Sequence, residues 1–146
     1  MLTNCKIFTA KSAGFCFGVD RAVKIVYNKL NNYDNLVTLG PIIHNNNVVM
    51  DLEAKGVRAI SDVSQVTEGQ PVVIRSHGVG LDVYEELETK NAVVIDATCP
   101  FVKRIHGIVS KAEEEGRLTI IIGTRVHPEV EGIAGWCGKC VIFESA

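Results

Sequence analysis

The sequence predicts an α/β protein made of βαβ units whose strands run parallel. Short runs rich in Val, Ile and Thr alternate with longer segments whose apolar residues recur at helical spacing. Such alternation favours right-handed crossovers and therefore parallel sheets. The unbroken apolar runs at 93–95 and 120–122 predict strands covered on both faces. With 146 residues, 47% of them hydrophobic, the chain is long enough for one domain with a core, or for one domain and part of another.

In the first half of the chain, short apolar runs end in turn residues and lead into helices. The first helix has apolar side chains at helical spacing, and the turn sequence at 31–35 ends it. Gly56 ends the second helix, because glycine readily adopts the left-handed conformation that follows a helix. The expected elements are strands at 6–10, 36–39 and 57–60, a capped turn at 61–63, and helices at about 19–30 and from His44 to Lys55.

In the second half, the strands are more continuously apolar and the helices have clearer ends. Pro100 fits the first turn of a helix, where its missing N–H leaves no hydrogen bond unmade, and Gly116 ends that helix. The expected elements are strands at 71–75, 92–96, 118–122 and 140–143, and helices at about 82–90, 101–115 and 129–134. We expect residues 1–98 to form a first α/β unit and residues 99–146 to begin a second.

Composition and charge exclude several classes of function. The net charge of −2 and the pI near 6.1 give no electrostatic basis for binding nucleic acid. The longest apolar runs are far shorter than the roughly 20 residues that cross a membrane, and no signal-peptide pattern opens the chain. Five cysteines are an odd number, and intracellular thiols more often bind metal or act in catalysis than form disulfides. We therefore expect a cytoplasmic protein with reduced thiols, which binds neither nucleic acid nor membrane.

Two cysteines each lie between an expected strand and an expected helix. Cys16 stands between Gly14 and Gly18, and Cys99 stands between a strand and Pro100. In parallel α/β sheets, ligands bind beyond the carboxyl ends of the strands, and a helix N-terminus favours the thiolate form that binds metals. A single cysteine in this position is more often a small buried hydrophobic residue. Because two cysteines share the position, we interpret Cys16 and Cys99 as metal ligands.

Three of the four histidines occupy the same kind of position. His44, His77 and His127 each follow an expected strand and precede a helix or a glycine turn. One such histidine is ordinarily a hydrogen-bonded loop residue, but three at one sheet edge make a pocket suited to a phosphate or diphosphate. The fourth, His106, lies within an expected helix, and we interpret it as structural.

Glu129, two residues after His127, is the candidate general acid. A carboxyl group sheltered among other site groups can have its pKa raised toward neutrality, as proton delivery requires. The alternative is an ordinary first-turn glutamate that complements the helix dipole. That description suits Glu131 better.

Cys137 and Cys140 form a CxxC motif that precedes a strand. A zinc site needs a second pair of ligands, and no second CxxC exists in the chain. We therefore interpret the motif as incidental. The alternatives are a partial metal site, or a zinc module completed by nearby histidines.

Five sequence motifs follow one another between Cys16 and Trp136. They are Gly14-Phe15-Cys16-Phe17-Gly18-Val19-Asp20-Arg21-Ala22, Ile43-His44-Asn45-Asn46, Ser76-His77-Gly78-Val79, Asp96-Ala97-Thr98-Cys99-Pro100 and His127-Pro128-Glu129-Val130-Glu131-Gly132. Together and in this order, they resemble the LytB family of 4-hydroxy-3-methylbut-2-enyl diphosphate reductases. Members of that family catalyse the last step of the non-mevalonate isoprenoid pathway.

The resemblance implies a trefoil of three α/β units around a central 4Fe–4S cluster held by three cysteines. It implies that a ferredoxin or flavodoxin supplies electrons, and that the substrate loses its hydroxyl group as water to give isopentenyl or dimethylallyl diphosphate. The matching residues are Cys16 and Cys99 for the cluster, His44, His77 and His127 for the diphosphate, and Glu129 with His127 for protonation.

The resemblance also implies a longer protein. Family members are about twice as long, and their third cluster cysteine lies beyond residue 146, since neither Cys137 nor Cys140 matches its motif. We therefore expect this chain to be an amino-terminal half of the enzyme, as a truncated product, a fragment or a split subunit, without activity alone. The alternative is a non-catalytic half-protein that binds diphosphate or a metal, or that pairs with a complementary C-terminal chain.

Overall fold

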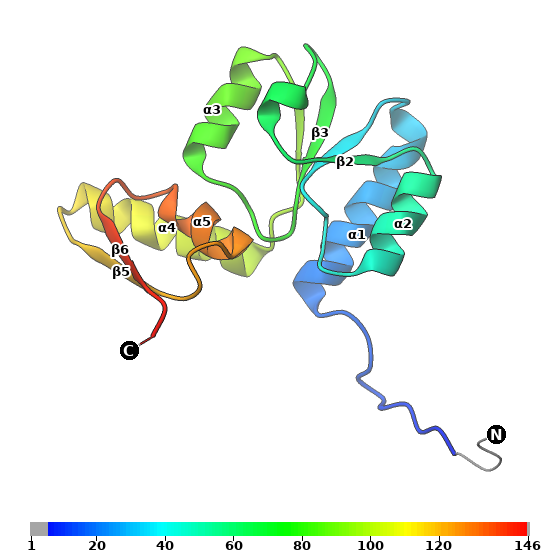
Figure 1. Ribbon diagram of the computed structural model, residues 1–146, viewed down its shortest axis with the longest axis horizontal. Coiled ribbons are helices and arrows are strands. Elements are labelled where there is room, and N and C mark those ends of the chain that lie inside the picture. Colours follow the sequence, from blue (N-terminus) through cyan, green and yellow to red (C-terminus); the bar gives the residue numbers. More distant parts are fainter. Residues whose placement is uncertain (1–5, 146) are drawn as a thin grey trace.

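The computed structural model describes residues 6–145 and shows an α/β protein with two parallel sheets (Figure 1). The larger sheet has the strand order β2-β1-β3-β4, and the smaller sheet pairs β5 with β6. Each of these pairs is parallel, which confirms the predicted fold class. The strands are β1 Val37–Leu39, β2 Arg58–Ile60, β3 Pro71–Ile74, β4 Val93–Asp96, β5 Thr119–Ile122 and β6 Cys140–Phe143.

Helices connect the strands at the places that the sequence predicts. The first helix begins at Phe17, slightly earlier than expected, and a 3-10 turn capped by Asp62 forms the expected capped turn. None of these helices is both long enough and apolar enough to cross a membrane. They are α1 Phe17–Lys29, α2 Asn46–Ala54, α3 Leu81–Thr89, α4 Pro100–Glu114 and α5 Pro128–Ala134, with 3-10 turns η1 Leu30–Asn32 and η2 Val63–Gln65.

Helices cover both faces of the larger sheet. On one face, Val26 of α1 and Leu52 of α2 are buried with Val73 of β3. On the other face, Leu87 of α3 is buried with Ile74 of the same strand. Alternate residues of a strand point to opposite faces, so the central strand β3 must be apolar throughout, as its sequence is.

The carboxyl ends of three neighbouring strands meet at one edge of this sheet. Leu39 of β1 pairs with Ile74 of β3, and Ile74 pairs with Asp96 of β4. The three strands therefore end level, and the loops that follow them leave the sheet side by side. Ligands bind at such an edge in parallel α/β proteins.

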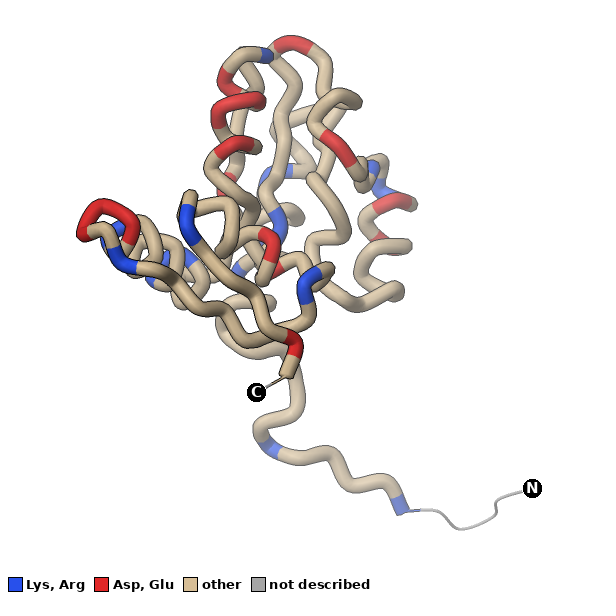
Figure 2. The backbone as a smooth tube through the Cα atoms, turned by 60° about the vertical axis from the view of Figure 1, so that its left-hand side comes forward, with Lys and Arg blue, Asp and Glu red and all other residues tan. Residues whose placement is uncertain are grey.

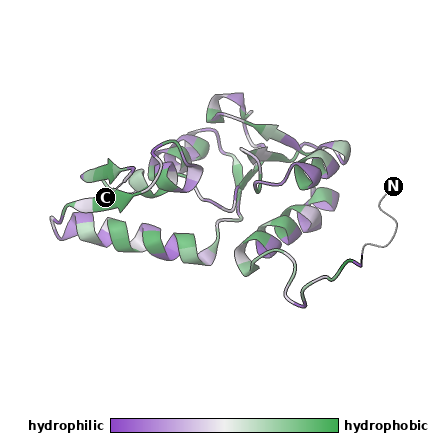
Figure 3. Ribbon diagram, turned by 60° about the horizontal axis from the view of Figure 1, so that its bottom comes forward, coloured by the Kyte–Doolittle hydropathy of each residue, from purple (hydrophilic) through white to green (hydrophobic). Residues whose placement is uncertain are grey.

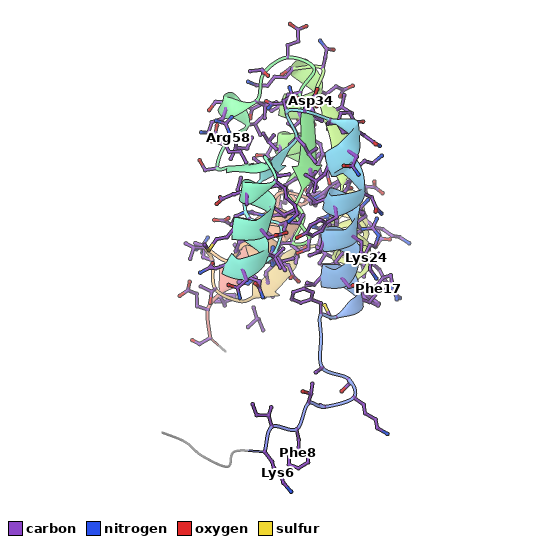
Figure 4. All side chains as sticks on the ribbon, turned by 90° about the vertical axis from the view of Figure 1, so that its right-hand side faces the viewer. Lys6, Phe8, Phe17, Lys24, Asp34 and Arg58 are labelled. Atoms are coloured by element: carbon purple, nitrogen blue, oxygen red, sulfur yellow. The ribbon has the colours of Figure 1, made fainter. Side chains whose placement is uncertain are left out.

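The strand predicted at 6–10 is wrong. These residues run away from the body of the molecule without forming a strand (Figure 1), and Ile7 and Phe8 are 90% and 87% exposed. Figure 4 shows the side chains of Lys6 and Phe8 clear of the helices and sheets. A strand is stable only when a neighbouring strand satisfies its backbone groups, and none of the described strands pairs with this segment. Cys16 therefore follows a loop with a turn at residues 10–13, and not a strand.

The strands at 93–95 and 120–122 are not covered on both faces, contrary to the prediction. In β5, Ile120 and Ile122 are 59% and 69% exposed, while Ile121 packs into a core formed with α4 and α5. The first two residues of β4 are exposed as well. Because both helices pack on the same face of the smaller sheet, no described residue covers its other, apolar face (Figure 3). An apolar run shows that a strand can be buried on both sides, but not that something covers it.

The difference between these two environments gives a first prediction. Ile74→Ala should lower the free energy of unfolding by about 2–5 kcal/mol, because it removes fully buried methyl groups and leaves a cavity. Ile122→Ala, on the open face of β5, should cost less than about 1 kcal/mol. Urea unfolding followed by circular dichroism measures both. Equal losses in the two variants would contradict the assignment of the core.

Candidate active site

Cys16 and Cys99 occupy equivalent positions at the starts of two helices. Cys16 is the N-cap of α1, and its carbonyl accepts a hydrogen bond from the N–H of Asp20 (2.9 Å). Cys99 is the N-cap of α4, and its carbonyl accepts one from Lys103 (3.0 Å). Neither thiol caps its own helix, and both are free in the described part of the chain. The structure thus presents two thiols at helix N-termini, where the partial positive charge favours a bound anion.

The two helix starts lie against each other. A Cβ atom placed on Gly18, in the first turn of α1, would overlap the Sγ atom of Cys99 and lie 3.0 Å from its Cβ. Gly18 therefore allows the first turn of α1 to approach Cys99 more closely than any other residue could. Arg21 of the same helix donates a hydrogen bond from Nη1 to the carbonyl of Thr98 (3.1 Å). Two independent contacts hold the two cysteine-bearing turns together.

Asp96 fixes the strand end that precedes Cys99. Its Oδ1 accepts a hydrogen bond from the N–H of Thr98 (2.8 Å), and its Oδ2 accepts one from the hydroxyl of Tyr84 (3.1 Å) and pairs with Nζ of Lys103 (2.6 Å). Burial disfavours the charged carboxylate, but the Lys103 ammonium and the Thr98 donors outweigh it and lower the pKa of Asp96. The carboxylate therefore stays charged and holds this loop in place.

His44, His77 and His127 come together from three separate loops. The ring centroids of His44 and His77 are 4.5 Å apart, and His127 lies 5.9 Å from the first and 6.0 Å from the second. His44 precedes Asn45, the residue whose side chain caps α2. His77 lies in the turn after β3, and His127 is the N-cap of α5. The predicted histidine cluster is thus present in the structure, with a helix start beside two of its members.

His77, the most buried of the three histidines, stays neutral among potential positive charges. Burial lowers the pKa of His77 to about 4, and the positive charges of His44, Arg75 and His127 act in the same direction. The Nδ1 atom of His77 is buried and has no hydrogen-bond partner among residues 6–145. An anion among these rings would relieve the repulsion between them.

The loops that carry His44, His77 and Cys99 contain no negative charge, whereas His127 is followed by Glu129 and Glu131. The segments 40–45, 76–80 and 97–100 contain neither Asp nor Glu. Figure 2 shows a row of acidic residues along α3 and further ones elsewhere in the molecule. A negatively charged ligand would therefore meet no acidic side chain from the loops of His44 and His77, and would meet Glu129 and Glu131 only on the side of His127.

His127 and Glu129 are linked through the first turn of α5. The Nδ1 atom of His127 accepts a hydrogen bond from the N–H of Glu129 (3.2 Å), so in the neutral ring the proton lies on Nε2. The Glu129 side chain is partly buried, whereas Glu131 is exposed. The two residues proposed for proton transfer are therefore held in one fixed turn.

Arg75 is a site residue that the sequence reasoning missed. It follows β3 directly, its guanidinium is half-buried, and its charge acts on His77 two positions later. Gly40, with a φ of +73°, leaves the space that the Arg75 side chain fills; a Cβ there would lie 3.4 Å from Cζ. Arg75 is the last residue of the strand predicted at 71–75, and its position directly before the Ser76-His77-Gly78 loop was the available signal.

Cys137 and Cys140 lie apart from this cluster, in the core between α4, α5 and the smaller sheet. Burial, followed by the neighbouring Cys140 thiol, raises the pKa of Cys137 to about 11, so it stays protonated. Among residues 6–145, no three His, Cys, Asp or Glu side chains form a group that could hold a metal ion. The zinc alternative therefore has no complete ligand set within the described residues.

Comparisons with known proteins agree with the motifs. The family model described as LytB protein matches residues 7–146. The 4-hydroxy-3-methylbut-2-enyl diphosphate reductase of Caldanaerobacter subterraneus subsp. tengcongensis is 48% identical over 136 residues, which cover 90% of this chain and 47% of that protein. The Clostridioides difficile protein of the same name is 43% identical over 141 residues, covering 96% of this chain and 50% of that protein.

Two solved structures are similar to the fold described above. One, a structure of (E)-4-hydroxy-3-methyl-but-2-enyl diphosphate reductase, aligns with a TM-score of 0.82 and 42% identity over 95% of this chain and 51% of that one. The other, the Plasmodium falciparum reductase, aligns with a TM-score of 0.86 and 32% identity over 92% of this chain and 43% of that one. The chain spans about half the length of the curated relatives it matches.

The low pKa of His77 predicts a pH-dependent loss of stability. Between about pH 6.5 and about pH 4 the unfolded chain binds a proton at residue 77 that the folded chain does not bind, so stability should fall as the pH falls through this window. His77→Gln should remove that component and give a flatter profile. Urea unfolding at several pH values measures it. If the free energies of unfolding of the two proteins, set equal at pH 8, fall by the same amount across this window, the low pKa of His77 is disproved.

Proposed function

The chain belongs to the LytB protein family, and from this premise we propose that it forms part of an iron–sulfur oxidoreductase that acts on (E)-4-hydroxy-3-methylbut-2-enyl diphosphate. The proposed reaction replaces the hydroxyl group by hydrogen, consumes two electrons and two protons, and releases water with isopentenyl or dimethylallyl diphosphate. The observation that carries the proposal is the cluster of three histidines at the sheet edge from which Cys99 also emerges.

His44, His77 and His127 are the proposed diphosphate ligands. Neutral His77 can donate one hydrogen bond, and the other two rings can bind a diphosphate oxygen as donors or as cations. α2 begins two residues after His44, and α5 begins directly after His127, so a helix N-terminus lies beside each of these two histidines. Binding here fixes the charged end of the substrate, so that the remaining atoms reach the cysteine-bearing turns.

Cys16 and Cys99 fit two positions of a 4Fe–4S cluster. Their thiols are free, both stand at helix starts, and Gly18 keeps the two turns close. Thiolates are the ligands that such clusters use in proteins. When bound, such a cluster would supply the electrons, one at a time, for the reductive removal of the hydroxyl group. We propose that its third cysteine comes from polypeptide outside this chain.

Glu129 is the proposed proton donor, and His127 assists it. Glu129 can deliver a proton to the departing hydroxyl group and a second one to the carbon skeleton after the C–O bond has broken. The hydrogen bond from the Glu129 N–H to Nδ1 of His127 leaves the Nε2 proton of His127 for the diphosphate or for transfer. The chain's own residues thus bind the substrate, orient it and move protons.

A complementary C-terminal polypeptide is the partner that we propose for this chain. Its relatives are about twice as long, and two apolar surfaces support such an association. One is the open face of β5 and β6, and the other is the segment that carries Ile7 and Phe8. In this arrangement residues 1–98 form the first unit of a trefoil around the cluster, and residues 99–146 begin the second. We further propose a ferredoxin or flavodoxin as electron donor and a cytoplasmic location.

A non-catalytic half-protein is the second candidate, because the chain matches only about half the length of its relatives. Such a protein would bind a diphosphate or a metal, or hold a complementary chain, without turnover. The reconstitution experiment below distinguishes it from the reductase, because only the reductase shows turnover with a complementary polypeptide.

Inorganic pyrophosphate tests the anion site. His44→Ala and His77→Ala should each weaken pyrophosphate binding about tenfold or more, because each removes a hydrogen bond to a charged group. Lys111→Ala, which removes an exposed cation near the far end of α4, should leave the affinity unchanged. Isothermal titration calorimetry measures the dissociation constants. Equal losses from all three variants would mean that binding reflects only net charge.

Anaerobic reconstitution with iron and sulfide tests the cluster ligands. With a polypeptide that supplies the second half of a relative, the chain should give a 4Fe–4S absorption and electron paramagnetic resonance signal, and reductase activity. Cys16→Ser and Cys99→Ser should abolish the signal, whereas Cys137→Ser should retain it. The chain alone should hold no stoichiometric cluster. A full cluster with reductase activity from residues 1–146 alone would refute the need for a partner.

A further inference from the structure

His106 has no role in the site described above, yet it is among the most buried polar residues of the molecule. It lies in the middle of α4 and is 4% exposed, on the same helix face as Val102 and Val109. Its ring stacks on the indole of Trp136, with centroids 5.1 Å apart and planes inclined by 16°. Its Nε2 atom is buried and has no hydrogen-bond partner among residues 6–145. A hydrogen bond from Nε2 to another described residue therefore does not explain why His106 is buried.

The edge of the His106 ring lies directly beneath the turn that carries His77. A Cβ atom placed on Gly78 would lie 2.7 Å from Cε1 and 3.3 Å from Nε2 of His106. Gly78 also has a φ of +74°, a conformation that side-chain-bearing residues rarely adopt. The backbone of the turn therefore rests on the imidazole with no side chain between them. A change in the position of the ring would therefore move Gly78 and, with it, the preceding residue His77.

Trp136, which stacks on His106, also contacts the turn that contains Gly78. Nε1 of Trp136 donates a hydrogen bond to the carbonyl of Val79 (2.8 Å), the residue after Gly78. A Cβ on Gly132 of α5 would lie 3.4 Å from the carbonyl of Gly78, so this helix also packs closely on the turn. The Gly78 turn is therefore in contact with α4, with α5 and with the indole of Trp136.

The same turn is bonded to the cysteine loop. The N–H of Cys99 donates to the carbonyl of Ser76 (2.9 Å), and Cys99 begins the helix that carries His106 two turns later. A closed path of contacts therefore runs from Cys99 along α4 to His106, across to Gly78, and back through Ser76. His77 lies on this path, between Ser76 and Gly78.

We propose that His106, stacked on Trp136, is a positioning residue that sets the orientation of His77 in the anion site. The proposal rests on the proposed function, because it gives His77 a ligand to bind. His106 itself touches no substrate. Its ring fixes the position of the Gly78 backbone, and the position of that turn fixes the orientation of the His77 imidazole. The proposal differs from a general packing role in that it requires an effect on His77 beyond the loss of stability.

A pair of variants on one helix face separates positioning from packing. His106→Ala removes the ring beneath the turn, and Val109→Ala removes a buried side chain one turn further along α4 that belongs to the core of the smaller sheet. Both should lower the melting temperature. Only His106→Ala should shift the ring resonances of His77 in two-dimensional NMR spectra and weaken inorganic pyrophosphate binding, by about tenfold.

The outcomes are distinct. If both variants shift His77 alike, or if His106→Ala leaves its resonances unchanged, the positioning role is wrong. If His106→Ala does not fold, Trp136→Phe takes its place, because it keeps a stacked ring but removes the hydrogen-bond donor to Val79. It should shift the His77 resonances and weaken pyrophosphate binding, both by less than His106→Ala. If Trp136→Phe changes neither, the proposal is wrong. If the unsubstituted chain binds no pyrophosphate, the proposed anion site fails, while the His77 resonances still decide the positioning role.

Discussion

The backbone of Ser76 makes the pair of hydrogen bonds on which the whole candidate site depends. Its N–H donates to the carbonyl of Ile42 (3.2 Å), and its carbonyl accepts from the N–H of Cys99 (2.9 Å). These bonds continue the parallel ladder beyond the ends of β1, β3 and β4. Because Ser76 is buried, water does not compete for them. His77 adjoins Ser76, and His44 lies two residues after Ile42, so the ladder places two of the site's side chains and one thiol together.

Charge at this edge is arranged for a negative ligand. Asp96 is engaged by Lys103, Tyr84 and the Thr98 backbone, so its carboxylate serves to hold the loop. His77 stays neutral because it is partly buried among other potential cations. A neutral imidazole can still donate one hydrogen bond to an anion, and the positive groups around His77 attract that anion.

The smaller sheet contributes to the site through the loop that follows its first strand. That loop leads to His127 and α5, and α5 packs against the Gly78 turn of the larger sheet. The two sheets are therefore joined at the site itself as well as by the chain. Cys99 and α4 make the second connection, because α4 begins at the edge of one sheet and forms the core of the other. The histidine cluster exists only while these two packing contacts hold.

The sequence by itself determined where the α-helices and the described strands lie, with small differences at their ends. The turns around Cys16, Cys99 and His127 were identified from neighbouring glycine and proline residues, because the conformations those residues favour are local. It did not determine that residues 6–10 lack a strand, or that one face of β5 is open, since both depend on whether other chain segments cover them. Only the tertiary structure brought Trp136 to Val79, 57 positions away. Such contacts follow from how whole elements pack, and no local spacing of residues records that packing.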